Sequence, residues 1–413
     1  MECVAFSKYS WIDFVFSVIG VCTFLLDWGS DVWVAAEFYC HGHFLWFGLL
    51  VSLLVLSSVV VQTFSWFWFQ YDRQLLGFSV IFGDRQKLSC LLHVLQLGFL
   101  YRHISAIRRG FRVWWWKEEG SEYAVYLTHD LSMLRLIETF SESAPQLTLM
   151  IYVLLHTNKA KAVQFVSIAA STTSIAWMVV DYHRSLRAFL PDKAKQGWGS
   201  SFVCFMWNLL LIAPRVAMLA LFTSVLPAYI AAHFVILWLV FLLWVCQQKT
   251  DFMDSVGGEW LYRATVALIW YFSWFNVGEG GTRGRSTIYH FFITADGGIL
   301  LATWWYYRDP TQTDSYALIL LIMLPLISLL GLLFKALYYC CFHPKLWRPN
   351  PNLPLDSPDA EVSFRDLSIQ DSTPSSQILN KRMACHAARF YSVHGVIQIT
   401  QTHRDLNRRL GDV

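Results

Sequence analysis

The most constraining feature of this chain is a set of apolar stretches, each about 20 residues long, that recur along most of its length. A helix of about 20 apolar residues is long enough to cross the hydrocarbon core of a bilayer. The composition agrees, since 55% of the residues are hydrophobic and only 15% are charged. We therefore expect an all-α polytopic membrane protein.

The apolar segments predict eight transmembrane helices and two re-entrant helices. The predicted crossings are 11–38, 44–69, 126–156, 162–181, 201–226, 228–246, 287–307 and 316–339, with an interruption expected at Pro214. Segment 88–107 is predicted to be re-entrant because positive residues flank both of its ends, and segment 261–277 because it is short. The order of crossings and re-entrant segments repeats, which predicts two parallel pseudo-repeats at about 10–187 and 200–341.

The distribution of basic residues predicts the orientation. With these crossings, Lys and Arg gather on one side of the membrane, and the other side keeps only Lys159, Lys161 and Arg308. The positive side faces the cytoplasm, so both termini are expected there. Residues 1–341 then form the transmembrane domain. Residues 342–413 are polar and rich in Pro, Ser and Asp, which predicts a largely disordered cytoplasmic tail with a regulatory role.

The stretch 129–146, HDLSMLRLIETFSESAPQ, carries several charges inside a long apolar run. The spacing of Arg135, Glu138 and Glu142 places them on one helix face. Pro145 removes a backbone donor and frees a carbonyl one turn earlier. One ionisable group at a bilayer centre costs about 2.5 to 3.5 kcal/mol on insertion scales. These side chains must therefore face a partner helix, a cavity or each other.

Segment 11–38 carries a second set of intramembrane charges. At about 100° per residue, Asp13 and Asp31 lie at the same angle, and Asp27 lies about 40° away. This polar stripe extends over about 27 Å, and it is either a polar path or a set of interhelical hydrogen bonds that hold the bundle together. The other candidate intramembrane charges are Asp130, Asp181, Arg215 and Asp296.

Several functions fit these charges. In a lipid scramblase, carboxylates would meet choline or amine groups and arginines would meet phosphate. A secondary transporter of a small polar solute fits equally well on physical grounds, and a structural subunit for another membrane protein is a third reading. The carboxylates of Asp130, Glu138 and Glu142 are calcium-type ligands, but Arg135 among them favours ion pairing. No GxxxxGK[ST] motif is present, which disfavours a pump. We expect no enzyme activity, no cofactor, no metal and no nucleic-acid partner.

Four stretches closely resemble the XK-related (Kell-complex-related) family of membrane proteins, and within it the caspase-activated phospholipid scramblases. They are FLLDWGSDVW (24–33), HDLSMLRLIETFSESAPQLTL (129–149), WMVVDYHRSLR (177–187) and LYRATVALIWYFSWFNVGEG (261–280). The resemblance implies the same eight-plus-two helix fold. It also implies ATP-independent movement of phospholipid between the leaflets of the plasma membrane, which exposes phosphatidylserine on apoptotic cells for engulfment. A single-pass chaperone of the basigin or neuroplastin type is the implied partner.

The resemblance also predicts a switch, and the position of Trp46 predicts a gate. A caspase-3 type protease cuts an exposed, extended segment after Asp and prefers another Asp three residues earlier. Asp356 and Asp359 meet both needs in the tail. Asp371 is the other tail candidate and lacks the upstream Asp, while the match at 251–254 lies close to the membrane. Trp46, near the outer end of its span, is predicted to limit lipid entry; the alternative is an interfacial anchor.

Overall fold

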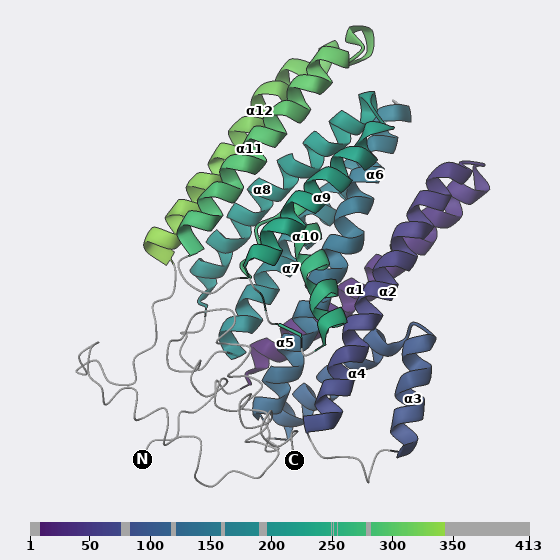
Figure 1. Ribbon diagram of the computed structural model, residues 1–413, viewed down its shortest axis with the longest axis vertical. Helices are drawn as coiled ribbons and strands as arrows, with labels where there is room; N and C mark the ends of the chain where they lie inside the picture. Colours follow the sequence, from purple (N-terminus) through teal and green to yellow (C-terminus); the bar gives the residue numbers. More distant parts are fainter. Residues whose placement is uncertain are drawn as a thin grey trace.

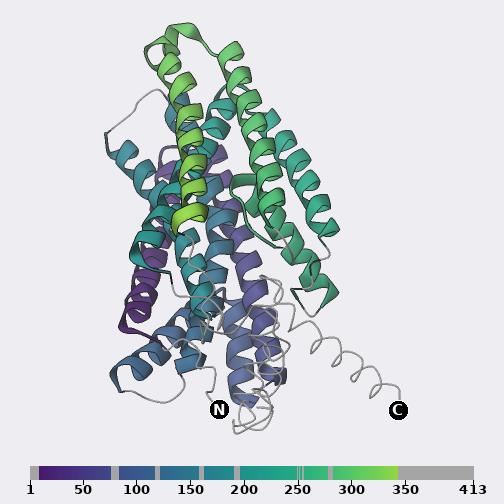
Figure 2. The same ribbon diagram turned by 90° about the vertical axis from the view of Figure 1, so that its left-hand side faces the viewer.

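The computed structural model describes residues 9–75, 83–116, 121–157, 162–189, 196–248, 250, 252–253, 255–277 and 282–342. This described part contains helices and no strand, as expected for an all-α membrane protein. The long helices run roughly side by side in a tall bundle (Figures 1 and 2).

Within the described residues, the first half of the chain contains seven α-helices and one π-helical turn. They are α1 (Trp11–Cys40), α2 (Phe44–Leu75), α3 (Gly83–Val94), α4 (Gly98–Trp115), α5 (Ser121–Glu138), η1 (Thr139–Ser143), α6 (Ala144–Thr157) and α7 (Ala162–Phe189). The second half forms α8 (Trp198–Val225), α9 (Tyr229–Gln247), α10 (Val256–Phe272), α11 (Thr282–Tyr307), α12 (Pro310–Leu337) and the π-helical turn η2 (Tyr338–Phe342).

Six helices of the described part are long and apolar enough to cross a bilayer, which identifies a multi-pass membrane protein. These six are α1, α2, α7, α8, α9 and α12. The predicted crossings at 126–156 and 287–307 correspond to α5–η1–α6 and to α11, which are not among the six. The first of these is divided by a π-helical turn and carries the charged stretch, and the second begins with basic residues.

Helix α8 is the scaffold on which the two halves meet. Helices α6 and α7 of the first half pack against it, and so do α11 and α12 of the second half (Figure 1). The predicted interruption at Pro214 is wrong, because α8 continues through this residue. Ile212 and Val216 on either side are fully buried, so packing against neighbouring helices holds the helix together where the proline removes one backbone bond.

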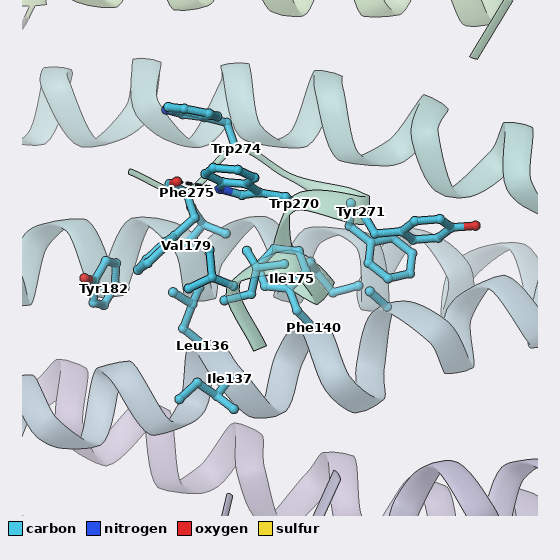
Figure 3. Close-up of a cluster of buried hydrophobic side chains, with 14 of the residues drawn as sticks. Leu136, Ile137, Phe140, Ile175, Val179, Tyr182, Trp270, Tyr271, Trp274 and Phe275 are labelled. Carbon is cyan, nitrogen blue, oxygen red and sulfur yellow. Dashed lines mark hydrogen bonds between the residues drawn. The ribbon is translucent and has the colours of Figure 1, made fainter. Parts of the chain in front are cut away.

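The tip of α10 fills the centre of the molecule. Trp270 and Tyr271 lie against side chains of α5, η1 and α7, and Trp270 donates a hydrogen bond of 2.6 Å to the carbonyl of Phe275 (Figure 3). The ring of Phe140 in η1 lies 6.3 Å from that of Phe272. Residues 273–277 continue from the helix as a buried extended segment. The segment predicted to be re-entrant at 261–277 is thus a helix followed by an extended stretch.

The other segment predicted to be re-entrant, 88–107, is a helix–turn–helix. Helix α3 ends at Val94 and α4 begins at Gly98, with Gln96 between them in the left-handed region at φ 62°. The carbonyl of Gln96 accepts a bond of 2.8 Å from Gln62, and its side chain accepts one of 2.7 Å from Ser58. Because both partners lie near the middle of α2, the tip of this hairpin reaches about half-way along the bundle.

Candidate functional site

A buried ion pair joins α5 to α7. The Nη1 atom of Arg135 lies 3.1 Å from Oδ2 of Asp181, and both side chains are nearly inaccessible to solvent. The Nη2 atom of Arg135 also donates to Thr23 of α1 at 3.2 Å. Gly20 on α1 makes room for this guanidinium, since a Cβ atom there would lie 2.1 Å from Nη1. The first half therefore holds one arginine where three helices meet.

A π-helical turn follows directly on the helix that carries Arg135. Residues Thr139–Ser143 form η1, and the backbone N–H of Ala144 donates to the carbonyl of Thr139. The wide turn ends two residues before Pro145, at the place where the proline was predicted to disturb the helix. Such turns insert an extra residue and re-aim the side chains after them. Glu142 lies in this turn and is buried, and its carboxyl interacts with those of Glu138 and Asp31.

Polar bonds connect α1 to η1 and α6 beyond this turn. Ser143 of η1 donates to Asp27 of α1 at 3.1 Å, and Gln146 of α6 donates to Asp31. Asp31 is buried, whereas Asp27 is exposed on the surface of the bundle. Not every charge of the predicted stripe is therefore buried, because Asp27 bonds to Ser143 from the exposed side of the contact. A small pocket beside it is lined by residues that include Arg135 and Glu138.

The polar side chains continue toward the beginning of α1. Asp13 accepts bonds from the backbone and the side chain of Ser10, at 2.8 and 2.9 Å, and so caps the helix. A second small pocket is lined by residues that include Asp13, Asp181 and Arg184. Arg184 of α7 interacts with both of these carboxylates, and its guanidinium lies 4.3 Å from the ring centre of Phe16.

We call this series of side chains the acidic track. It consists of Asp13, Asp27, Asp31, Arg135, Glu138, Glu142, Asp181 and Arg184. Carboxyl groups outnumber guanidinium groups in it by three to one. Charges of one sign in a low-dielectric setting favour binding of a mobile group of the opposite sign. The track is therefore suited to attract a cationic group, with two arginines available for an anionic one.

Trp46 lies beyond the end of the track at which Asp31 sits. It is half-buried, with its ring 5.8 Å from Phe38 of α1, 4.5 Å from His43 and 6.0 Å from His156 of α6. The residue therefore bridges α1, α2 and α6, where the polar contacts between α1 and α6 stop. This position is compatible with the predicted gate and with the interfacial anchor.

Three of the predicted intramembrane charges lie away from the acidic track. Asp130 is buried at the contact with α4, with Oδ2 3.7 Å from Nη1 of Arg102. Arg215 of α8 and Asp296 of α11 pair with each other at 2.5 Å in the second half. The Nε2 atom of His233 on α9 donates to the other carboxylate oxygen at 3.1 Å. The ten predicted charges thus form three clusters in place of one path.

The sequence did not predict one member of the track, Arg184, or two side chains that bond to the track, Thr23 and Gln146. The spacing of Asp181 and Arg184, which are three residues apart and so share a helix face, was a usable signal. Thr23 and Gln146 gave none, because single hydroxyl and amide side chains are common in membrane helices.

Two further predictions concern the caspase cleavage site and metal binding. The candidate cleavage residues Asp356, Asp359 and Asp371 lie outside the described residues. Within the described residues, no group of three or more His, Cys, Asp or Glu side chains is arranged to hold a metal ion.

Comparison with known proteins gives consistent matches over most of the chain. A family model described as XK-related protein matches residues 15–344. Two fish proteins named XK-related protein 8 are similar along nearly their whole length. The one from Gasterosteus aculeatus is 74% identical, covering 95% of this chain and 100% of the relative. The one from Tetraodon nigroviridis is 72% identical, with 95% and 99% covered. A protein of the same name from Pan troglodytes is 45% identical over 82% of this chain and 86% of the relative.

Proposed function

The chain belongs to the XK-related family, and we propose that it is a phospholipid scramblase that moves lipids between leaflets without ATP. The observation that carries this proposal is the acidic track, a polar series along α1, α5, η1 and α7 with Asp27 exposed at the surface of the bundle. Because this polar face is open toward the lipid, a headgroup can move along the protein while its acyl chains stay in the bilayer.

The charges of the track match the two parts of a headgroup. Carboxylates such as Glu138 and Asp27 would receive the amine of phosphatidylserine or the choline of phosphatidylcholine. Arg135 and Arg184 would receive the phosphate, as guanidinium groups do. The track runs from Asp13 to Asp31, about 27 Å along α1, which is nearly the thickness of a hydrocarbon core. Each contact replaces part of the hydration that a headgroup loses on entering the membrane.

The topology that goes with this proposal has eight crossings and two re-entrant segments. In it, α5–η1–α6 and α11 also cross, while α3–α4 and α10 with its extended continuation enter and return. Two observations support it: the tip of α3–α4 bonds to the middle of α2, and Arg215 in α8 donates 3.0 Å to the carbonyl of Tyr271 at the tip of α10. Both termini would be cytoplasmic, in the plasma membrane.

Control of the activity would come from the tail, residues 342–413. We place the switch at caspase cleavage after Asp359, with Asp356 as the upstream residue and Asp371 as the alternative site. Phosphatidylserine exposure after an apoptotic stimulus would be compared between the wild type, Asp359→Ala, Asp371→Ala and the double variant. Full exposure in all of them contradicts the switch, and loss in Asp371→Ala alone assigns the cleavage to Asp371.

A partner of the basigin or neuroplastin type is also part of the proposal, for delivery of the protein to the cell surface.

Reconstitution separates this function from the transport of a small polar solute. Purified full-length protein is placed in vesicles with a fluorescent phospholipid, before and after treatment with a caspase, and an impermeant reductant quenches the outer leaflet. Scrambling predicts that the fraction quenched rises well above one half in the cut sample. A solute transporter or a structural subunit leaves that fraction at the protein-free level.

A further inference from the structure

A crevice separates α11 from α12 on the side of the bundle away from the acidic track. Both helices pack along α8 and lie beside each other (Figures 1 and 2). Between them is a cavity of about 250 Å³, with Arg215 and Met218 of α8 in its floor and His290, Gly298 and Leu329 in its walls. Gly298 and Leu329 are exposed on the outside of the bundle, so the crevice opens toward the membrane.

One wall of this crevice is formed by residues that contact a buried lysine. Lys335 of α12 is only 7% exposed. Its Nζ atom bonds to Ser286 at 2.8 Å and to Nε2 of His290, and lies 5.9 Å from the ring centre of Trp274. His290 and Trp274 both line the crevice. The lysine therefore lies directly behind the crevice wall, near the end of α12 that leads to the tail.

Lys335 has no carboxylate partner within the described part of the chain. Its contacts there are a hydroxyl, an imidazole and the rings of two tryptophans, and none of them carries a negative charge at neutral pH. A buried cation is stable only when an opposite charge or enough acceptors accompany it. Arg283, exposed at the same end of α11, adds a second positive charge to this end of the crevice.

We propose that the crevice binds a phospholipid of net negative charge. Its phosphate lies at the rim, which is the end of the crevice next to His290 where Lys335, Ser286 and Arg283 gather, and one acyl chain lies in the crevice toward Met218. The charges argue for an anionic headgroup, because basic pockets between helices on the cytoplasmic side of a membrane select such lipids. The length fits as well: His290 and Leu301, which both line the cavity, are separated by about 16 Å along α11, which is close to the thickness of one leaflet of the hydrocarbon core.

This site is distinct from the acidic track in position and in charge. The track has an excess of carboxylates and lies on α1, α5, η1 and α7, whereas the rim is basic and belongs to α11 and α12. A lipid bound here is held in place and does not need to cross the membrane. Binding can therefore be measured without any transport, so a failure of this proposal is separate from a failure of the scrambling proposal.

Photochemical labelling tests the site directly. The full-length protein is placed in phosphatidylcholine nanodiscs that contain one of three probes with a photoreactive acyl chain: phosphatidylserine, phosphatidylcholine or a free fatty acid. After illumination, the labelled peptides are mapped by mass spectrometry. We expect the phosphatidylserine probe to label α11 and α12 several-fold more than the phosphatidylcholine probe. Equal labelling by these two, or preferential labelling by the fatty acid, overturns the proposal.

Two variants test the chain and the headgroup separately. Gly298→Phe fills the crevice from α11, where a Cβ atom would meet no neighbour, and should remove labelling by every probe. The matched control is Gly48→Phe on α2, which is also exposed and unobstructed and should leave labelling unchanged.

Lys335→Met tests the headgroup site and should abolish the preference for the anionic probe. Arg283→Gln, at an exposed position, is the second headgroup variant if Lys335→Met does not fold, and it should reduce that preference. Retained labelling in Gly298→Phe contradicts the site.

Discussion

Each half of the molecule contains a buried arginine that pairs with an aspartate on a neighbouring helix, and the surroundings of Arg135 and Arg215 differ. In the second half, Arg215 and Asp296 pair at 2.5 Å, and His233 bonds to the second carboxylate oxygen of Asp296. In the first half, Arg135 and Asp181 pair at 3.1 Å within a series that has an excess of carboxylates and an open side at Asp27. An arginine–aspartate pair can therefore either hold two helices together or form part of a polar path.

The largest effect is expected from opening the pair of the second half. Asp296→Ala leaves the guanidinium of Arg215 buried without its carboxylate, which should cost about 3 to 5 kcal/mol of stability. Thermal unfolding in detergent and the yield of monodisperse protein measure the loss. The double variant Arg215→Met with Asp296→Leu is the control, since replacing a whole buried pair by apolar side chains is tolerated far better. If Asp296→Ala were as stable as the wild type, the Arg215–Asp296 pair would have no structural role.

The packing of Gly20 against Arg135 should give the next largest effect. Gly20→Ala places a methyl group within 2.1 Å of the guanidinium and must displace it, at a cost of about 1 to 3 kcal/mol. Gly29→Ala on the same helix is the matched control, because a Cβ atom there meets nothing within 4 Å. Stability and scrambling should both fall in Gly20→Ala only. Equal behaviour of the two variants would mean that the guanidinium does not need this position.

Removing a charge from the track should change activity more than stability. Glu138 is half-buried beside a pocket that Asp27 and Arg135 also line, so Glu138→Gln keeps the shape and loses only the charge. If one headgroup contact contributes about 1 to 2 kcal/mol, scrambling should slow by a factor of about 5 to 30. The same exchange at Glu259, which is buried in α10 and accepts 2.8 Å bonds from the backbone of Phe252 and Met253, should affect folding instead.

The smallest effect is expected at Trp46. If it limits entry to the track, Trp46→Ala should raise scrambling a few-fold in uncut protein and leave the rate of caspase-treated protein nearly unchanged. Trp46→Phe, which keeps an aromatic ring against Phe38 and His43, is the conservative comparison. An unchanged resting rate in Trp46→Ala would leave only the anchoring role.

The sequence predicted the long helices well because their signal is local. The start of α1 at Trp11 and of α2 at Phe44 follow directly from apolar runs and helix length. The π-helical turn at Thr139–Ser143 could not be predicted, since it depends on how Glu142 and its neighbours pack against α2, α7 and α10. Proline chemistry located the disturbance before Pro145 but gave the wrong result at Pro214, where tertiary packing prevails.

The sequence predicted which charged residues lie within the membrane, but it did not predict how they pair. Helical periodicity identified Asp13, Asp31 and Arg135, because these depend on position within one helix. It could not assign Asp130 to Arg102, or Arg215 to Asp296, because pairing between helices depends on their arrangement in space. Burial also differed within one predicted stripe: four residues separate Asp27 from Asp31, yet only Asp31 is covered by neighbouring helices.

The central claim is that headgroups pass along the acidic track, and a covalent block tests it most directly. Ser143 bonds at 3.1 Å to Asp27, the exposed member of the track. Ser143→Cys, in a chain whose exposed native cysteines are replaced by serine, is labelled with a bulky cationic thiol reagent after reconstitution and caspase treatment. Thr303→Cys on α11 is the control. The account predicts that labelling at position 143 lowers scrambling to the protein-free rate and that labelling at position 303 does not. Full labelling at position 143 with an unchanged rate would contradict it.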